Sequence, residues 1–244
     1  MLVMGHPQFE TQDDDGIGYG IPPIPEWQLE HGALLEQPDW LGLDIDFAVW
    51  NVFFRLRTIF QRAQRTPLST TRLHDLTCFV VHRLLSSAPA DTMHTQSSTC
   101  SECIRYGIIL YMFITQGPTY FSHAVILDAL VDRFMEHVDR LGSIPRVLVI
   151  HGSLDLWLLA IGMVASSGTA KYQWFAEKAQ ATFTSLHMGS WDEVLARIKS
   201  VLWLDTPRGE SIFRPHWDAF LGLSNRSAPT ELAISLTSAS GLIP

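Results

Sequence analysis

A run of apolar residues over positions 154–165 constrains the fold more than any other part of the sequence. Only Asp155 and Gly162 interrupt it, and neither a two-residue nor a 3.6-residue alternation of polar and apolar positions is present. A helix that is apolar on every side is buried on every side. The carboxylate of Asp155 falls in the first turn, where the positive end of the helix dipole favours it. We therefore expect a central helix over about residues 153–166, enclosed by other helices.

Three small residues follow one another at helical spacing near the end of this run. Gly162, Ala165 and Ser166 occupy positions i, i+3 and i+4, so they share one face of the expected helix. A face without bulky side chains allows the backbone of a neighbouring helix to come close. We expect a second helix to pack tightly against this stripe.

The charge of the chain is concentrated at its N-terminus. Residues 1–54 contain ten Asp or Glu and no Lys or Arg, whereas the other residues of the 244 contain fifteen acidic and seventeen basic side chains. A chain of this length can bury a large core and is expected to form one domain with a tail. The nearly neutral body offers no electrostatic footprint for a phosphate backbone, so we expect no direct binding of nucleic acid.

From the cysteines, the first residues and the longest apolar stretch we expect a reducing compartment, no secretory signal and no membrane span. The chain has three cysteines, Cys78, Cys100 and Cys103, and its first seven residues lack the charged and apolar regions of a secretory signal. The longest apolar stretch, residues 147–165, is interrupted by His151 and Asp155 among other polar groups, which disfavours a membrane span. We read this stretch as part of a soluble core.

We expect three regions along the chain. Residues 1–38 are acidic and rich in Gly and Pro, and their apolar surface is too small to offset the cost of ordering, which predicts an extended or disordered tail. An acidic activation-type segment carrying Trp27, Leu29 and Trp40 is the alternative. Residues 39–224 should form the domain, and residues 225–244 a loosely ordered C-terminal tail.

The domain reads as all-α. Helical periodicity or unbroken apolar character predicts further helices over residues 41–65, 70–85, 103–115, 122–141, 170–186, 190–202 and 212–221. The Ser190 and Glu193 pair has the spacing of a capping box at the start of one of them, and Gly142 should end another. The Ser/Thr-rich residues 86–101 predict a loop, and residues 146–150 are the single strand candidate.

Two patterns that could carry chemistry are incomplete. Residues 147–153 resemble a strand that ends in His-Gly, but a hydrolase would also need a Gly-x-Ser-x-Gly nucleophile turn, which the chain lacks. Cys100 and Cys103 have metal-ligand spacing, and Cys78, His94 and His123 could add ligands, but a second tight pair is missing. Buried free thiols are the commoner outcome. We therefore predict no enzyme activity, no metal and no cofactor.

Five of the eight tryptophans lie in the C-terminal half of the chain, namely Trp157, Trp174, Trp191, Trp203 and Trp217. Core packing is the first interpretation, because tryptophan supplies the most apolar area per residue. The alternative is that some rings line a cavity for a lipophilic molecule. In that case Trp157, Ile161 and Trp174 are the predicted lining residues.

The order of several motifs resembles one known family. Four segments carry the resemblance, namely residues 156–162 (LWLLAIG), 172–175 (YQWF), 190–194 (SWDEV) and 201–205 (VLWLD). The upstream apolar residues 102–111 (ECIRYGIILY) fit as well. In this order they resemble the helical regulatory domain of fungal-specific transcription factors, which lies C-terminal to a binuclear zinc-cluster module. The resemblance extends over about residues 69–221.

The resemblance implies an all-α regulatory module in the nucleus, or otherwise in the cytoplasm, that acts through effectors, protein partners or self-association. Because the six cysteines of a zinc cluster are missing from this chain, DNA binding is not carried over. We therefore expect a non-catalytic regulator that acts through protein interaction. A receptor-like domain with a helical pocket for a sterol or similar ligand is the alternative, and an enzyme would require polar side chains that converge in a pocket.

Trp191 and Trp203 are the rings that we expect to determine the fold. If they are buried, Trp191→Ala or Trp203→Ala should each lower the free energy of unfolding by about 3–5 kcal/mol, because both apolar contacts and volume are lost. Urea denaturation followed by circular dichroism measures this change. A loss below about 1 kcal/mol would contradict the assignment of either ring to the core.

Overall fold

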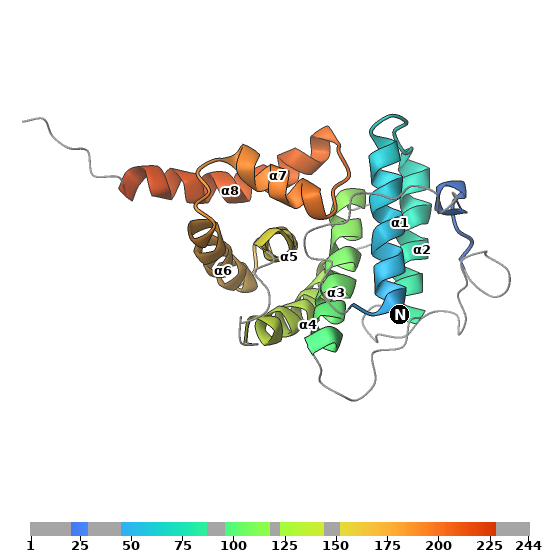
Figure 1. The fold of residues 1–244 in the computed structure, drawn as a ribbon, viewed down its shortest axis with the longest axis horizontal. Coiled ribbons are helices and arrows are strands. Elements are labelled where there is room, and N and C mark those ends of the chain that lie inside the picture. The colour runs from blue at the N-terminus through green and yellow to red at the C-terminus, as the bar shows by residue number, and fades with distance from the viewer. Residues whose placement is uncertain (1–20, 29–44, 87–95, 118–122, 144–151, 228–244) are drawn as a thin grey trace, which may run out of the picture.

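The computed structural model describes residues 21–28, 45–86, 96–117, 123–143 and 152–227. All regular secondary structure in these ranges is helical, which confirms the all-α prediction (Figure 1). The elements are a short 3₁₀ helix, η1 (Pro25–Gln28), and the α-helices α1 (Phe47–Ala63), α2 (Thr70–Ser86), α3 (Gln96–Gln116), α4 (His123–Ser143), α5 (Gly152–Ala165), α6 (Lys171–Ser185), α7 (Trp191–Val201) and α8 (Pro207–Ser227).

Helix α5 is the centre of the packing. It contacts α3, α4, α6, α7 and α8, and in Figure 1 it lies between α3 on one side and α6 on the other. Trp157, Ala160 and Ile161 are completely buried, and Asp155 occupies the first turn. The central helix predicted over about residues 153–166 is therefore confirmed to within a residue at each end. Its uniform apolar character is explained by neighbours on every side.

The close approach of a neighbouring helix that the small-residue stripe predicted is present at Gly162, where α6 packs against α5. A Cβ atom at Gly162 would lie only 2.2 Å from Cδ1 of Phe175, so the ring of Phe175 occupies the space that any side chain at position 162 would need. Phe175 is itself fully buried and stacks on Phe134 of α4 with ring centroids 5.8 Å apart. One turn later the Ser166 hydroxyl donates a 2.6 Å hydrogen bond to the Gly162 carbonyl. The missing side chain at Gly162 is thus what allows α4, α5 and α6 to meet.

Two helices are longer than the sequence indicated. The predicted loop over residues 86–101 is wrong for its last part, because α3 already begins at Gln96. The hydroxyl of Ser101, which is buried, accepts a 2.8 Å hydrogen bond from the amide of Asp46. This contact across the fold stabilises a Ser/Thr-rich turn whose residue types have weak helix propensity of their own.

Helix α8 begins five residues before the predicted 212–221 segment and extends to Ser227. Pro207 suits the first helical position, since its fixed φ fits and its missing N–H would have no partner there. Pro215 lies inside the helix, where proline is normally unfavourable. The rings of Phe213 and Trp217 on either side are buried, and this burial offsets the lost hydrogen bond.

The predicted capping box at the start of α7 is present in a modified form. Ser190 accepts a 3.3 Å hydrogen bond from the amide of Glu193, as expected. The Glu193 carboxylate, however, accepts from the amide of Gly189 at 2.7 Å rather than from Ser190. Both side chains still cap free amides at the helix N-terminus.

The expectation of an unstructured tail over residues 1–38 is wrong for residues 21–28. Ile24 and Trp27 are buried, and the η1 segment contacts α1. The ring of Trp27 meets Phe79 of α2 edge-on, with ring centroids 4.8 Å apart. Burial of Ile24 and Trp27 against the helices thus orders a short segment whose overall composition favours disorder.

Several predictions concern residues outside the described ranges. These are the rest of the N-terminal tail, most of the C-terminal tail and the strand candidate at residues 146–150. Within the described residues, no helix has both the length and the apolar character needed to cross a membrane.

Two glycines test the close packing of α5. Gly162→Ala should lower the free energy of unfolding by about 1–3 kcal/mol, because the new methyl group overlaps a ring that cannot move away. Gly142→Ala is the matched control: α4 continues through Gly142 to Ser143, contrary to the predicted stop, and a Cβ there has no atom within 4 Å. The control should raise stability by about 0.4–1 kcal/mol by restricting the unfolded chain. Equal effects in thermal or urea unfolding would refute the packing argument.

Candidate functional site

Trp157, the first of the predicted lining residues, is fixed by contacts on two sides. Its indole N–H donates a 2.8 Å hydrogen bond to the carbonyl of Leu202, just after α7. On the other side a Cβ at Gly107 of α3 would lie 2.9 Å from the Cζ3 atom of the ring. The ring is completely buried. Trp157 thus connects the centre of α5 to both α3 and the end of α7.

Tyr111 of α3 binds the same connection between α7 and α8. Its hydroxyl accepts a 2.7 Å hydrogen bond from the amide of Leu204, two residues after the carbonyl that Trp157 binds. Burial raises the pKa of the Tyr111 phenol, and Asp205 adds to this, although the Leu204 N–H acts in the opposite direction. The phenol therefore stays neutral and serves as a hydrogen-bonding group. The ring of Tyr111 also lies 6.0 Å from that of Trp157 and 6.4 Å from that of Trp203.

The other two predicted residues have different surroundings. Ile161 is completely buried in the core. Trp174 is only half-buried; its ring meets Phe175 edge-on at 4.8 Å, and the ammonium group of Lys178 lies 4.5 Å from its centroid. Trp157 therefore contacts α3 and the α7 end, whereas Trp174 has its ring partners within α6. Ligand binding by these three residues stays a prediction.

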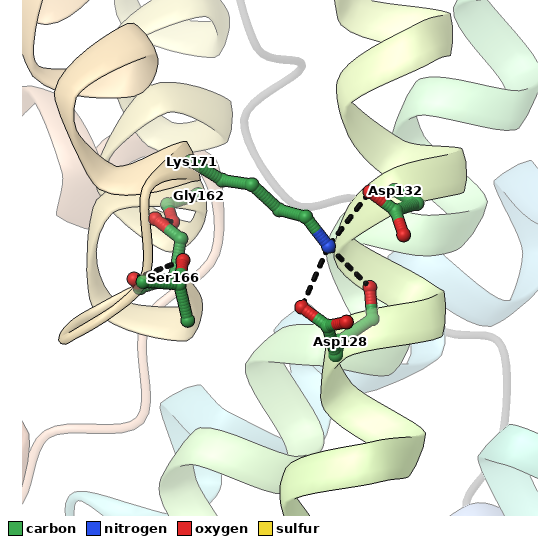
Figure 2. A network of polar contacts seen from close by, with 6 residues as sticks. Asp128, Asp132, Gly162, Ser166 and Lys171 are labelled. Atoms are coloured by element: carbon green, nitrogen blue, oxygen red, sulfur yellow. Dashed lines mark hydrogen bonds and ion pairs between the residues drawn. The ribbon is translucent and has the colours of Figure 1, made fainter.

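A network of polar side chains joins α4 to α6 and is drawn in Figure 2. Lys171, at the start of α6, extends across to α4. Its ammonium nitrogen lies 2.6 Å from a carboxylate oxygen of Asp128, 2.7 Å from one of Asp132, and 3.2 Å from the Asp128 carbonyl. Further along the same two helices, Lys178 pairs with Asp139 at 3.2 Å. These pairs fix the position of α6 relative to α4 on the outer side of the Phe134 and Phe175 stack.

The environment of Lys171 favours its charged form. Burial opposes the charge, but the hydrogen bonds to Asp128 and Asp132 outweigh this effect and raise the pKa of the amine. The two carboxylates are more than half exposed, with exposed fractions of 55% and 57%, so solvent screens much of the attraction. The network can position helices, and its lysine is held in the protonated form.

The cysteine pair is buried at the start of α3. Cys100 and Cys103 are both free thiols in the core. Burial raises the pKa of Cys100 to about 12, with a further contribution from Asp155, and burial also raises the pKa of Cys103 well above the usual value. Both thiols therefore stay protonated, which makes them poor nucleophiles, because the thiolate is the reactive form. Among the described residues, no group of three or more His, Cys, Asp or Glu side chains is placed to hold a metal ion.

Sequence reasoning did not anticipate the roles of Tyr111 and Lys171. Asp128 and Asp132 are four residues apart in the sequence and so share one face of α4. Their partner Lys171 lies 43 residues from Asp128 in the chain, and Leu204 lies 93 residues from Tyr111. No local pattern connects such distant positions, so only the folded structure identifies these pairs.

Lys171→Met tests the network. The substitution should lower the free energy of unfolding by about 0.5–1 kcal/mol at low ionic strength, and a double-mutant cycle with Asp132→Asn should give a coupling of similar size. The coupling should shrink in about 1 M salt, where charges are screened within about 3 Å. Because the folded-state pKa of Lys171 is raised, this stabilisation is complete below about pH 10.4 and is lost as the pH rises further. A coupling that is unchanged by salt would contradict an electrostatic origin.

Comparison with known proteins gives no relationship from which a function could be transferred. No protein-family model, no curated protein and no solved structure matches the chain. The resemblance to fungal transcription-factor regulatory domains therefore depends on the motifs of this sequence alone.

Proposed function

We propose that this protein is a non-catalytic regulatory module of the fungal transcription-factor type, acting through protein contacts and without a DNA-binding module of its own. The proposed location is the nucleus, or otherwise the cytoplasm, and the proposed partners are other proteins or a second copy of the chain. No cofactor is part of the proposal.

The observation that supports this proposal is that the five motif segments meet around one helix. Residues 156–162 form the middle of α5, and residues 102–111 lie in α3, which packs on α5. Residues 172–175 contribute Phe175, which fills the space beside Gly162. Residues 190–194 begin α7, and residues 201–205 carry the backbone groups that Trp157 and Tyr111 bind. The motifs thus define one packing unit.

The side chains that would carry chemistry have structural roles in this unit. Trp157 and Tyr111 bind backbone groups, Lys171 bridges two helices, and the thiols of Cys100 and Cys103 are protonated in the core. These arrangements support a module that is built to present a surface. Fold-level analogy supplies the transcriptional part of the proposal.

A tethering experiment tests the proposed function. The chain is fused to a heterologous DNA-binding domain, and transcription from a reporter with the matching sites is measured. We expect reporter output to change severalfold relative to the DNA-binding domain alone, because the module should recruit or exclude transcriptional partners. The fusion with Trp157→Ala, which removes the central ring, should lose this effect.

The tethering experiment can also contradict the proposal. An unaltered reporter from a stable, expressed fusion would count against transcriptional regulation. The sterol-receptor alternative is examined by thermal unfolding with a panel of lipids, since a ligand that binds only the native state raises the midpoint. A saturable increase that Ile161→Ala or Trp174→Ala removes would replace the proposed function with the receptor.

A further inference from the structure

The ordered N-terminal segment, residues 24–28, is held on the α1–α2 pair by a specific set of contacts. We call this segment the strap. The guanidinium of Arg55 in α1 donates a 2.8 Å hydrogen bond to the Trp27 carbonyl and also lies 5.3 Å from the centroid of the Trp27 ring. Arg72 of α2 forms an ion pair with Glu26. With Phe79 beneath the indole, the surface recognises a backbone carbonyl, an aromatic ring and an adjacent carboxylate.

The N-terminal region that contains the strap and the helix pair that it covers carry opposite charge. Residues 1–44 contain nine Asp or Glu and no Lys or Arg, whereas residues 45–86 contain six Arg and two Asp. Complementary charge of this kind favours encounter and selects partners of the matching sign. The helix pair is therefore suited to acidic segments in general, and the strap is one such segment.

The contact between the strap and the helix pair is made by one short segment, which buries Ile24 and Trp27. It depends on one short turn, in which the Trp27 amide donates to the Ile24 carbonyl at 2.9 Å, and on one large ring. The indole N–H of Trp27 is buried and has no hydrogen-bond partner among the described residues. A buried donor without a partner weakens an interaction. Segments with few contacts open locally far more often than the core does.

We infer that the surface formed by Arg55, Arg72 and Phe79 is a recognition site for an acidic, tryptophan-bearing peptide of a partner protein, and that the chain's own strap occupies it until such a peptide displaces it. The strap then competes with the partner for the same site. The apparent affinity for the partner is the intrinsic affinity multiplied by the fraction of the time that the strap leaves the site free. The inference rests on the proposed function as an interaction module, and it names the surface used.

The test uses the full-length chain and a fluorescein-labelled peptide of residues 21–28 (IPPIPEWQ). Trp27→Ala should release the strap and let the added peptide bind, as measured by fluorescence anisotropy. If the wild-type site is free about one tenth of the time, the variant should bind the peptide about tenfold more tightly than the wild type. Phe47→Ala is the matched control, because it removes an exposed aromatic ring from the start of α1 and should bind like the wild type.

A charge exchange identifies the site. Adding Arg72→Glu to the Trp27→Ala chain should weaken binding of the wild-type peptide, and a peptide carrying Glu26→Arg should restore it. Circular dichroism and a cooperative thermal transition establish that each variant is folded. Should Trp27→Ala fail to fold, the full-length Glu26→Arg chain provides the same test, since it weakens the strap but keeps the ring.

Three results would overturn the inference. The first is equally weak peptide binding by the wild-type chain and by the folded released variant. The second is binding that does not respond to the charge exchange. The third is a concentration-dependent dimer of the wild-type chain that Trp27→Ala abolishes, which would make a second copy the occupant. The peptide-binding test is read by anisotropy and the proposed function by reporter output. A negative result in one test can therefore be told apart from a negative result in the other.

Discussion

The burial of α5 on all sides is the constraint on which the rest of the structure depends. A helix without a polar face must be surrounded, and α3, α4, α6, α7 and α8 all contact it. The close contact at Gly162 fixes how near α6 can come, and Phe175 and Phe134 then set the position of α4. Figure 1 shows the consequence, with α5 enclosed in the middle of the helices. The apolar character of one segment thus determines the arrangement of its neighbours.

Polar groups in this fold complete the packing. Trp157 and Tyr111 bind the carbonyl of Leu202 and the amide of Leu204, which have no helical partners after α7 ends. Buried backbone groups need such partners, since an unpaired one costs about 1–3 kcal/mol. The Lys171 network plays a similar part at the surface between α4 and α6 (Figure 2). These polar contacts therefore hold the connection after α7 and the position of α6 relative to α4.

The α1–α2 pair differs from the α5-centred packing in what covers it. Its outer partner is the short strap, which is attached by Arg55, Arg72 and Phe79. A face covered by a short acidic segment is easier to uncover than one covered by a long helix, because fewer contacts must break. The helices packed around α5 thus form the stable core of the molecule, and the face of the α1–α2 pair under the strap is the recognition surface that we propose.

The sequence alone determined the all-α class, the central helix and the small-residue contact at Gly162, because each follows from the types and spacing of residues that are near one another in the chain. It did not reveal the early start of α3, the length of α8 through Pro215, or the ordering of residues 21–28. Each of these depends on a partner that is distant in sequence or on the burial of nearby rings: Asp46 for Ser101, Phe213 and Trp217 around Pro215, and Phe79 for Trp27. Local propensity is weak at all three places, so the free energy of tertiary contacts decides them, and only the folded chain brings those contacts together.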